Sequence, residues 1–347
     1  MPGLVRIGWR CRALGASALG CGLLALSACG GAAVSDAPPE PGRLPPAIEL
    51  GEVTDRGMAA VERGQRLVHE GLSRTALAEF ERAISINPTL TPAYIGAGTI
   101  YLERGELNDA ERRFRRAAEL EPRNFEAQFG HGRALELLGR LTEAVRAYVA
   151  ALGVRPNDFD ANLNLGRLYL AMGESRQALG HVTAAVRLRP QNGEARIALA
   201  STYARLGRHG EAVVEYQQAA ELMPLTPELL LSLADSLGRT GRHEESAATL
   251  ETLLRQEPSA AAYERLGAAL FRLRRYADAE QAFRTAIELD DRHYPALNGL
   301  AVCRLNHYLW SDRMDRAALS EARQLMRQSL RIERNQPQIV ELMTRYR

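Results

Sequence analysis

Two histidines recur in the same local sequence, as the ligands of a metal site shared between repeated units would. His209 and His243 lie 34 residues apart, which is the period of the sequence repeat described below, and each follows Gly-Arg. Imidazole nitrogens are common zinc ligands, but equivalent positions of neighbouring helix pairs lie about 9 to 10 Å apart, which is too far for two rings to share one ion. We therefore interpret both as exposed turn residues, and we expect neither a metal nor another cofactor.

Cys303 is the next residue that could do chemistry, as a nucleophile. It lies in an apolar stretch that is predicted to be helical, and no pair of His and acid recurs near it. A buried thiol of this kind is a small core residue and is inert. The sequence also contains no HExxH, CxxC, GxSxG or phosphate-loop motif. It therefore predicts no enzymatic activity and no small-molecule substrate.

Cys29 is the third candidate, and it would be a site of covalent modification and not a catalytic group. Arg6, Arg10 and Arg12 precede an apolar stretch over residues 13–26, as in a secretory signal peptide, and this stretch is too short to span a bilayer comfortably. The stretch ends in Leu26, Ser27, Ala28 and Cys29. This resembles the bacterial lipobox, whose cysteine is diacylated and becomes the N-terminus. An ordinary cleaved signal with an incidental cysteine is the alternative, and Cys21 is a poorer second candidate.

The segment after the lipobox is typical of a flexible tether. Residues 30–46 carry five prolines with Ala and Gly between them. We expect residues 1–28 to be a lipoprotein signal peptide and residues 29–52 to be the lipidated Cys29 and its tether. Because Gly30 and not Asp follows, resemblance to enteric bacterial sorting implies an outer membrane lipoprotein facing the periplasm. In a Gram-positive host the same motif would place the chain on the outer face of the cytoplasmic membrane.

The charge composition gives no case for a nucleic-acid partner. All 44 basic residues are Arg, which indicates a GC-rich genome more than a surface selected for phosphates. The net charge of +2 becomes 2 − 3 = −1 once a leader with its three arginines is removed. A nearly neutral protein does not attract nucleic acid through its overall field.

The strongest signal in the chain is a repeat with a period of about 34 residues. It is carried by a series of prolines and, in phase with it, a series of glycines. The prolines are Pro88, Pro122, Pro156, Pro190, Pro224 and Pro258. The glycines are Gly71, Gly105, Gly139, Gly173, Gly207 and Gly241. In the first five repeats alanines flank a bulky position between them, which is occupied by Phe80, Phe114, Tyr148, Val182 and Tyr216. In the sixth repeat the bulky residue is Leu250, and Ser246 and Leu253 replace the two alanines.

This pattern of small, bulky and small residues before a proline resembles the tetratricopeptide repeat (TPR) family. The repeat over residues 91–124 matches best, with Tyr94, Ala97, Gly98, Tyr101, Gly105, Ala110, Phe114, Ala117 and Pro122. The resemblance implies an all-α, right-handed α-solenoid of about eight TPR helix pairs. We expect the TPR array to span residues 53–335, and a C-terminal capping helix to span residues 336–347.

The pattern departs from the family toward its C-terminal end. The seventh repeat is one residue short and ends in Asp291 where Pro is expected. The last repeat carries an insertion near residues 305–318, with His307, Tyr308 and Trp310 in it. We interpret it as a longer helix or loop, and the alternative is an aromatic contact point for a partner.

In TPR proteins the binding surface is usually the concave face, lined by the first helix of each pair. Mapped by repeat position, the predicted groove residues are Arg133, Asn164, Arg167, Ser201, Arg205, Asp235 and Arg239. They form a mixed polar strip, and each could equally be an ordinary solvated residue. The basic clamp of chaperone-binding TPR domains does not match, because Glu194 and Ala198 stand where Lys and Arg are needed.

These features predict a lipid-anchored envelope scaffold that binds protein or peptide segments through its concave face. It would assist assembly of a secretin, pilus, export or cell-wall complex. The chain is weakly similar to type IV pilus pilotin lipoproteins, which also combine a lipobox with stacked repeats. The alternative is a structural spacer or oligomerisation module without a peptide groove. The sequence does not identify the partner.

Overall fold

The computed structural model describes residues 50–346, and this range is helical throughout apart from short connections. The helices are α1 (Leu50–His69), α2 (Ser73–Ile86), α3 (Thr91–Glu103), α4 (Leu107–Leu120), α5 (Phe125–Leu137), α6 (Leu141–Val154), α7 (Phe159–Ala171), α8 (Ser175–Leu188), α9 (Gly193–Arg205), α10 (His209–Leu222), α11 (Pro227–Arg239), α12 (His243–Gln256), α13 (Ala260–Arg272), α14 (Tyr276–Leu289), α15 (Tyr294–Trp310), α16 (Arg316–Ile332) and α17 (Pro337–Arg345). The predicted signal peptide, Cys29 and most of the predicted tether lie outside the described residues.

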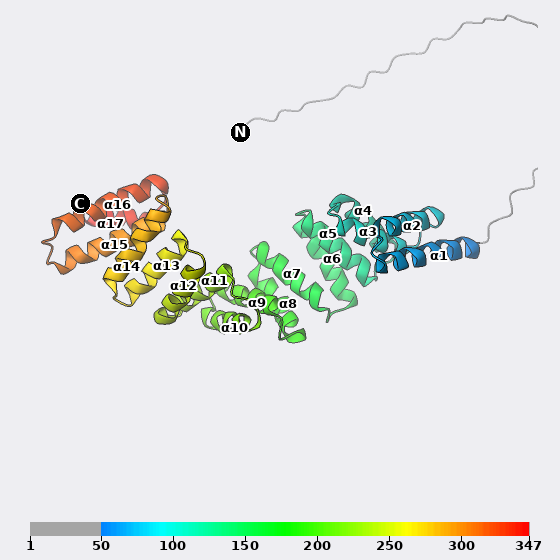
Figure 1. The fold of residues 1–347 in the computed structure, drawn as a ribbon, viewed down its shortest axis with the longest axis horizontal. Coiled ribbons are helices and arrows are strands. Elements are labelled where there is room, and N and C mark those ends of the chain that lie inside the picture. The colour runs from blue at the N-terminus through cyan, green and yellow to red at the C-terminus, as the bar shows by residue number, and fades with distance from the viewer. Residues whose placement is uncertain (1–49, 347) are drawn as a thin grey trace, which may run out of the picture. The chain divides into compact units, whose positions relative to one another are not determined.

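The helices from α1 to α16 form eight successive hairpins. We call the odd-numbered member of each pair helix A and the even-numbered member helix B. Each helix packs mainly against helices one or two places along the chain, and Figure 1 shows the pairs following one another in chain order. No helix of residues 50–346 is long and apolar enough to cross a membrane. The predicted all-α solenoid of eight helix pairs is confirmed.

Helix A ends in the same way in each of the first six pairs. In the second pair the amide of Glu106 donates to the carbonyl of Tyr101 at 2.9 Å, which closes the end of α3 around Gly105. Gly105 has a φ of 74°, and the φ values of the five equivalent glycines lie between 74° and 80°. Only Gly adopts this left-handed conformation without steric cost. The glycine series therefore sets the length of helix A.

Five A helices begin with a capping side chain that lies one or two residues after the repeat proline. The caps are Asn124, Asp158, Asn192, Thr226 and Ser259, and each accepts a hydrogen bond from the amide three residues later. Such a bond satisfies one of the free amides at a helix start. Proline breaks the preceding helix B, and the cap then starts the next helix A.

Each bulky residue of helix B fills the space between two A helices. The ring of Phe114 on α4 lies against Gly98 of α3 and Gly130 of α5. Ala110 and Ala117, on the same helix, are fully buried. Small residues let the backbones approach and leave room for the ring. A helix pair thus completes its core only with its neighbour, as the solenoid architecture requires.

The seventh pair is one residue out of register, as the sequence predicts. The connection before α13 is residues 257–259, whereas the connection before α11 is residues 223–226. As a result, the place of the repeat glycine is taken by Arg274, which lies one position short of a full period after Gly241. Arg274 has a φ of 61°. The same closing bond forms, since the amide of Arg275 donates to the carbonyl of Leu270 at 2.9 Å.

The ends of the array differ from its middle. α1 begins at Leu50, so the last three residues of the segment predicted as tether, residues 50–52, are helical. The insertion in the last repeat lengthens both helices, because α15 and α16 have 17 residues each against 13 and 14 in the preceding pair. α17 covers the last pair, and its Ile339 is buried against Leu319 and Met326. α17 thus lies within residues 336–347 and covers part of the apolar surface of the last pair.

Candidate functional site

The A helices α7, α9, α11, α13 and α15, together with α17, line a chain of four hollows. The first lies between α7 and α9, the second involves α9, α11 and α13, the third lies between α11 and α13, and the fourth between α13, α15 and α17. Their volumes are about 430, 470, 270 and 860 Å³ in that order. Neighbouring hollows share lining residues, so the four form one continuous groove, which we call the A-helix groove.

Five of the seven predicted groove residues line this groove. Arg167, Ser201 and Arg205 line the first hollow. Arg205 also lines the second hollow, together with Asp235 and Arg239. Their sequence positions are equivalent in the repeat, and the helices bring them onto one surface. The structure therefore brings these five residues together along the first two hollows.

The other two predicted residues lie beside Tyr148, and neither lines one of the four hollows. The buried Tyr148 hydroxyl donates to Glu136 at 2.6 Å, and burial is the largest cause that raises its pKa. Arg133 and Asn164 both act on this hydroxyl in the opposite direction and lower its pKa. Arg133 and Asn164 therefore belong to a polar cluster with Tyr148 and Glu136, at the N-terminal end of the predicted strip.

Ion pairs neutralise part of the groove. Arg167 lies 3.3 Å from Glu194, across the first hollow. Arg265, on α13, lies 2.6 Å from Asp235. Ser201 shares a 3.0 Å hydrogen bond with the hydroxyl of Tyr216. These contacts join consecutive A helices, or helix A to its own helix B, so they hold the groove wall in shape.

The sequence mapping missed the α13 side of the groove. Glu264, Arg265 and Arg272 line it, although none was predicted. Arg272 stands one position short of a full period after Arg239, because the seventh repeat lacks one residue. Applying that single-residue shift, which the sequence itself shows, would have extended the strip to Arg272.

Glu264 is the least solvated acid of the groove. It lines both the second and the fourth hollow. Burial raises the pKa of its carboxyl, the neighbouring Arg265 lowers it, and the charge of Asp235 raises it. Removing a carboxylate from water disfavours its charged form. Burial is therefore the largest influence on the pKa of this carboxyl group.

The two histidines singled out for metal binding are not exposed turn residues, and that expectation was wrong. His209 and His243 are the first residues of α10 and α12, are half-buried, and line the second and third hollows. Starting helix B next to the end of helix A places them against the groove wall. Within residues 50–346, no three side chains of His, Cys, Asp or Glu gather as a metal site would need.

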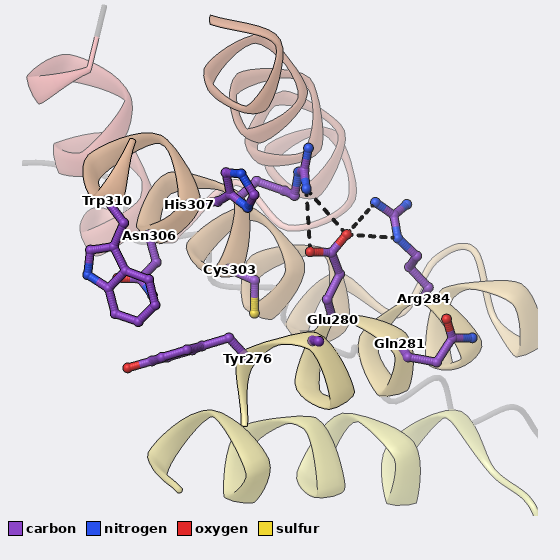
Figure 2. A pocket seen from close by; sticks show the side chains of 10 residues that line it. Tyr276, Glu280, Gln281, Arg284, Cys303, Asn306, His307 and Trp310 are labelled. Atoms are coloured by element: carbon purple, nitrogen blue, oxygen red, sulfur yellow. Dashed lines mark hydrogen bonds and ion pairs between the residues drawn. The ribbon is translucent and has the colours of Figure 1, made fainter. Parts of the chain in front are cut away.

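A separate cavity of about 400 Å³ lies between α14 and the lengthened α15 (Figure 2). Glu280 lies at its wall, 2.9 Å from Arg284 and 3.4 Å from Arg304. Trp310, in the extra turn of α15, is 64% exposed and meets Tyr276 edge-on with ring centroids 4.5 Å apart. The insertion therefore presents an exposed aromatic ring, as the alternative interpretation of it requires.

Cys303 lines the same cavity but is not an activated thiol. The residue is buried, and burial raises the pKa of the Cys303 thiol to about 12. The charge of Glu280 raises it further, while Arg304 lowers it. A nucleophilic cysteine needs the opposite shift, since the thiolate is the reactive form. The structure agrees with the interpretation of Cys303 as a core residue.

Comparison with known protein families identifies one type of repeat. The sequence pattern of the tetratricopeptide repeat matches residues 95–161, 163–228, 231–295 and 265–332. No curated protein sequence matches the chain significantly.

Solved structures with the same fold are similar at low sequence identity. PilF of Pseudomonas aeruginosa has a TM-score of 0.52 at 19% identity, covering 62% of this chain and 98% of PilF. A chain of the Cut9-Hcn1 hetero-tetramer of the APC/C has a TM-score of 0.50 at 19% identity, covering 81% of this chain and 55% of that one. A tetratricopeptide repeat protein of Parabacteroides merdae has a TM-score of 0.48 at 18% identity, covering 72% and 99%. These similarities concern the fold alone.

Proposed function

The chain belongs to the tetratricopeptide repeat family, and from this premise we propose that it is a scaffold that binds an extended segment of another protein in the A-helix groove. The observation that carries the proposal is the continuity of the four hollows, which share lining residues from α7 to α17. An extended peptide needs a long surface with polar groups at intervals, whereas a small substrate needs one enclosed pocket. TPR folds are typically non-catalytic scaffolds, and the buried thiol of Cys303 fits that role.

We propose that this scaffold acts at the cell envelope, as a lipoprotein anchored through Cys29. The support is the lipobox-like run ending at Cys29, preceded by a charged and an apolar segment. Two or more acyl chains on one cysteine hold a protein on a membrane more firmly than a single chain. With Gly30 after the cysteine, the proposed location is the outer membrane, with the repeats facing the periplasm.

The proposed role is assembly of an envelope complex, namely a secretin, pilus, export or cell-wall complex. The support is the combination of a lipobox-like run, a Pro-rich segment and a tetratricopeptide repeat array in one chain. The fold similarity to PilF is compatible with this role and does not identify it.

Affinity capture from native membranes, followed by mass spectrometry, tests the proposal. Three forms are compared: the wild type, the Cys29→Ser variant, and a groove variant with Arg167, Arg205 and Arg239 each changed to Glu. A matched control changes Arg74, Arg123 and Arg187 to Glu; these are exposed, have no ion pair within residues 50–346, and line none of the four hollows.

We expect the wild type and the control to retain the same envelope partners, and the groove variant to lose them with unchanged helicity. Cys29→Ser should move the protein out of the membrane fraction. Equal capture by the groove and control variants would contradict the groove proposal and favour a spacer or oligomerisation module. A Cys29→Ser protein that stays membrane-bound would contradict the anchor.

A further inference from the structure

Three arginines stand at repeat-equivalent places along the A-helix groove. Arg205, Arg239 and Arg272 are the last residues of α9, α11 and α13. Each lines two neighbouring hollows: Arg205 the first and second, Arg239 the second and third, and Arg272 the third and fourth. We call these three residues the arginine ladder. It runs through the whole groove, with one guanidinium at each junction between hollows.

The ladder arginines have no acidic partner within residues 50–346, unlike the arginines next to them in the same repeats. Three residues further along, an arginine paired to its own acid precedes each helix B. These pairs are Arg208 with Glu211, Arg242 with Glu245, and Arg275 with Asp278. No carboxylate among the described residues lies within ion-pair distance of a ladder arginine, and Arg205 donates to the carbonyl of Leu170 instead. The ladder therefore keeps its charge free.

The ladder is also accessible. Arg205, Arg239 and Arg272 are all exposed. The position at the end of a helix favours a cation through the helix dipole, but that effect is worth only about 0.3 to 1 kcal/mol and acts at any exposed place in the last turn. It does not account for the alignment of all three on one groove.

The charged residues that line the groove give it a net positive charge. They are five arginines and three acids: Arg167, Arg205, Arg239, Arg265, Arg272, Glu194, Asp235 and Glu264. Two arginine–acid pairs cancel, as described above, and the acid left over is Glu264. Glu264 is the least exposed of the three acids, and its carboxylate lies 3.9 Å from Arg265. The three ladder arginines therefore outnumber the one remaining acid, and the groove keeps a net charge of 5 − 3 = +2.

The spacing of the ladder sets the spacing of its ligand. Packed helices lie about 8 to 10 Å apart. An extended chain in the polyproline II conformation advances about 3.1 Å per residue with three residues per turn, so every third side chain lies on the same side, about 9 Å from the last. Carboxylates on every third residue of such a peptide would therefore meet successive ladder arginines. Arginine binds a carboxylate through two parallel hydrogen bonds, which gives both strength and geometry.

We propose that the partner segment is acidic, and that the arginine ladder binds an extended peptide with Asp or Glu at every third residue. The inference rests on the proposed function, because it identifies the chemistry of the segment held in the same groove. A neutral or basic segment would leave three guanidinium groups unpaired under the bound chain.

The test is fluorescence anisotropy with the full chain carrying Cys29→Ser and three labelled synthetic peptides. The first has four Glu at every third position among Ala and Ser, the second has the same composition with the four Glu together, and the third has Gln in place of Glu. The ladder variant changes Arg205, Arg239 and Arg272 to Gln, and the control changes Arg74, Arg123 and Arg187 to Gln, with helicity measured for both.

We expect the spaced Glu peptide to bind the wild type and the control at least tenfold more tightly than the Gln peptide, and more tightly than the clustered peptide. The ladder variant should lose at least tenfold in affinity for the spaced peptide. Added salt should weaken this binding, because it screens exposed charges.

Equal binding of the Glu and Gln peptides, or an unchanged affinity in the ladder variant, would overturn the inference. A groove that binds the Gln peptide equally well still binds peptides, so the proposed function would stand. Binding of none of the three peptides overturns the acidic inference as well, and partner capture from membranes then decides the proposed function independently.

Discussion

Gly130 of α5 lies directly against the ring of Phe114 on α4, in the preceding repeat. A Cβ added at Gly130 would lie 2.2 Å from Cε1 of Phe114, closer than two non-bonded carbon atoms can approach. The Gly130→Ala variant must therefore move the ring or part the helices, and overpacking of this kind costs typically about 1 to 3 kcal/mol. We expect its midpoint of urea unfolding, followed by circular dichroism, to fall.

The control for this substitution is Gly153→Ala on α6. Gly153 is exposed, and an added Cβ there would meet nothing within 4 Å. Alanine in a helix is favoured over glycine by about 0.5 to 1 kcal/mol, so this variant should be slightly more stable than the wild type. If Gly130→Ala matched Gly153→Ala in stability, the close packing of the ring would be refuted.

The repeat pattern predicted most of the fold because each repeat residue has one local role. Gly105 ends helix A, Phe114 fills the space between two successive A helices, and Pro122 follows the end of helix B. The order of these residues therefore determines the order of the helices. The boundary at residues 50–52 could not be predicted, because the first helix A has no preceding repeat to limit its length. Its extra turns depend on sequence outside the period.

The groove was predicted for the repeats that keep the period and missed where the period changes. Arg205 and Asp235 were found because equivalent positions recur at a constant interval up to the sixth repeat. Arg272 was missed because one residue is absent before α13. Arg133 and Asn164 lie on A helices, but neither lines one of the four hollows. The shape of the surface around them depends on the packing of Tyr148 and Glu136, which the position of a residue in the repeat does not determine.

Arg274 holds a backbone conformation that the chain elsewhere gives to glycine. Its φ is 61°, at the position where six other repeats have Gly. A residue with a Cβ is strained there, so Arg274→Gly should stabilise the protein by about 0.5 to 1 kcal/mol after the greater freedom of glycine in the unfolded chain is counted. The thermal midpoint measured by circular dichroism should rise.

Gly241→Ala gives the reciprocal test of this strain. Gly241 has a φ of 80°, so alanine should destabilise the sixth pair by roughly 1 kcal/mol. A lower midpoint for Arg274→Gly would show that the guanidinium makes a contribution that outweighs the strain.

The array should lose stability as the pH falls from about 7.5 to 5.5, partly through His131. Burial lowers the pKa of this imidazole, the neighbouring Glu111 raises it, and Arg115 and Arg140 lower it. In the unfolded chain the pKa is about 6.5, so below that pH the unfolded state binds more protons than the folded state and is favoured. The urea midpoint should therefore be highest near pH 7.5 and fall as the pH decreases toward about 5.5.

His131→Gln isolates this contribution. Burial also lowers the pKa of His181 and His293, so the variant should keep part of the pH dependence and lose the share of His131. The difference between wild type and variant midpoints should shrink as the pH falls. A constant difference over this range would exclude His131 as a source of the pH dependence.

Labelling of Cys303 should report the opening of the last two repeats. In a chain with Cys11, Cys21 and Cys29 changed to Ser, Cys303 is the one remaining thiol. Burial raises its pKa to about 12, and relative to a free thiol of pKa about 8.5 the thiolate fraction at pH 8 is lower by roughly three orders of magnitude. We expect a disulfide reagent to label it more than a hundredfold faster in 8 M urea than in buffer, with Cys303→Ser showing no labelling. Rapid labelling of the folded protein would mean that α14 and α15 part readily, and the cavity beside Trp310 would then be an opening rather than a fixed hollow.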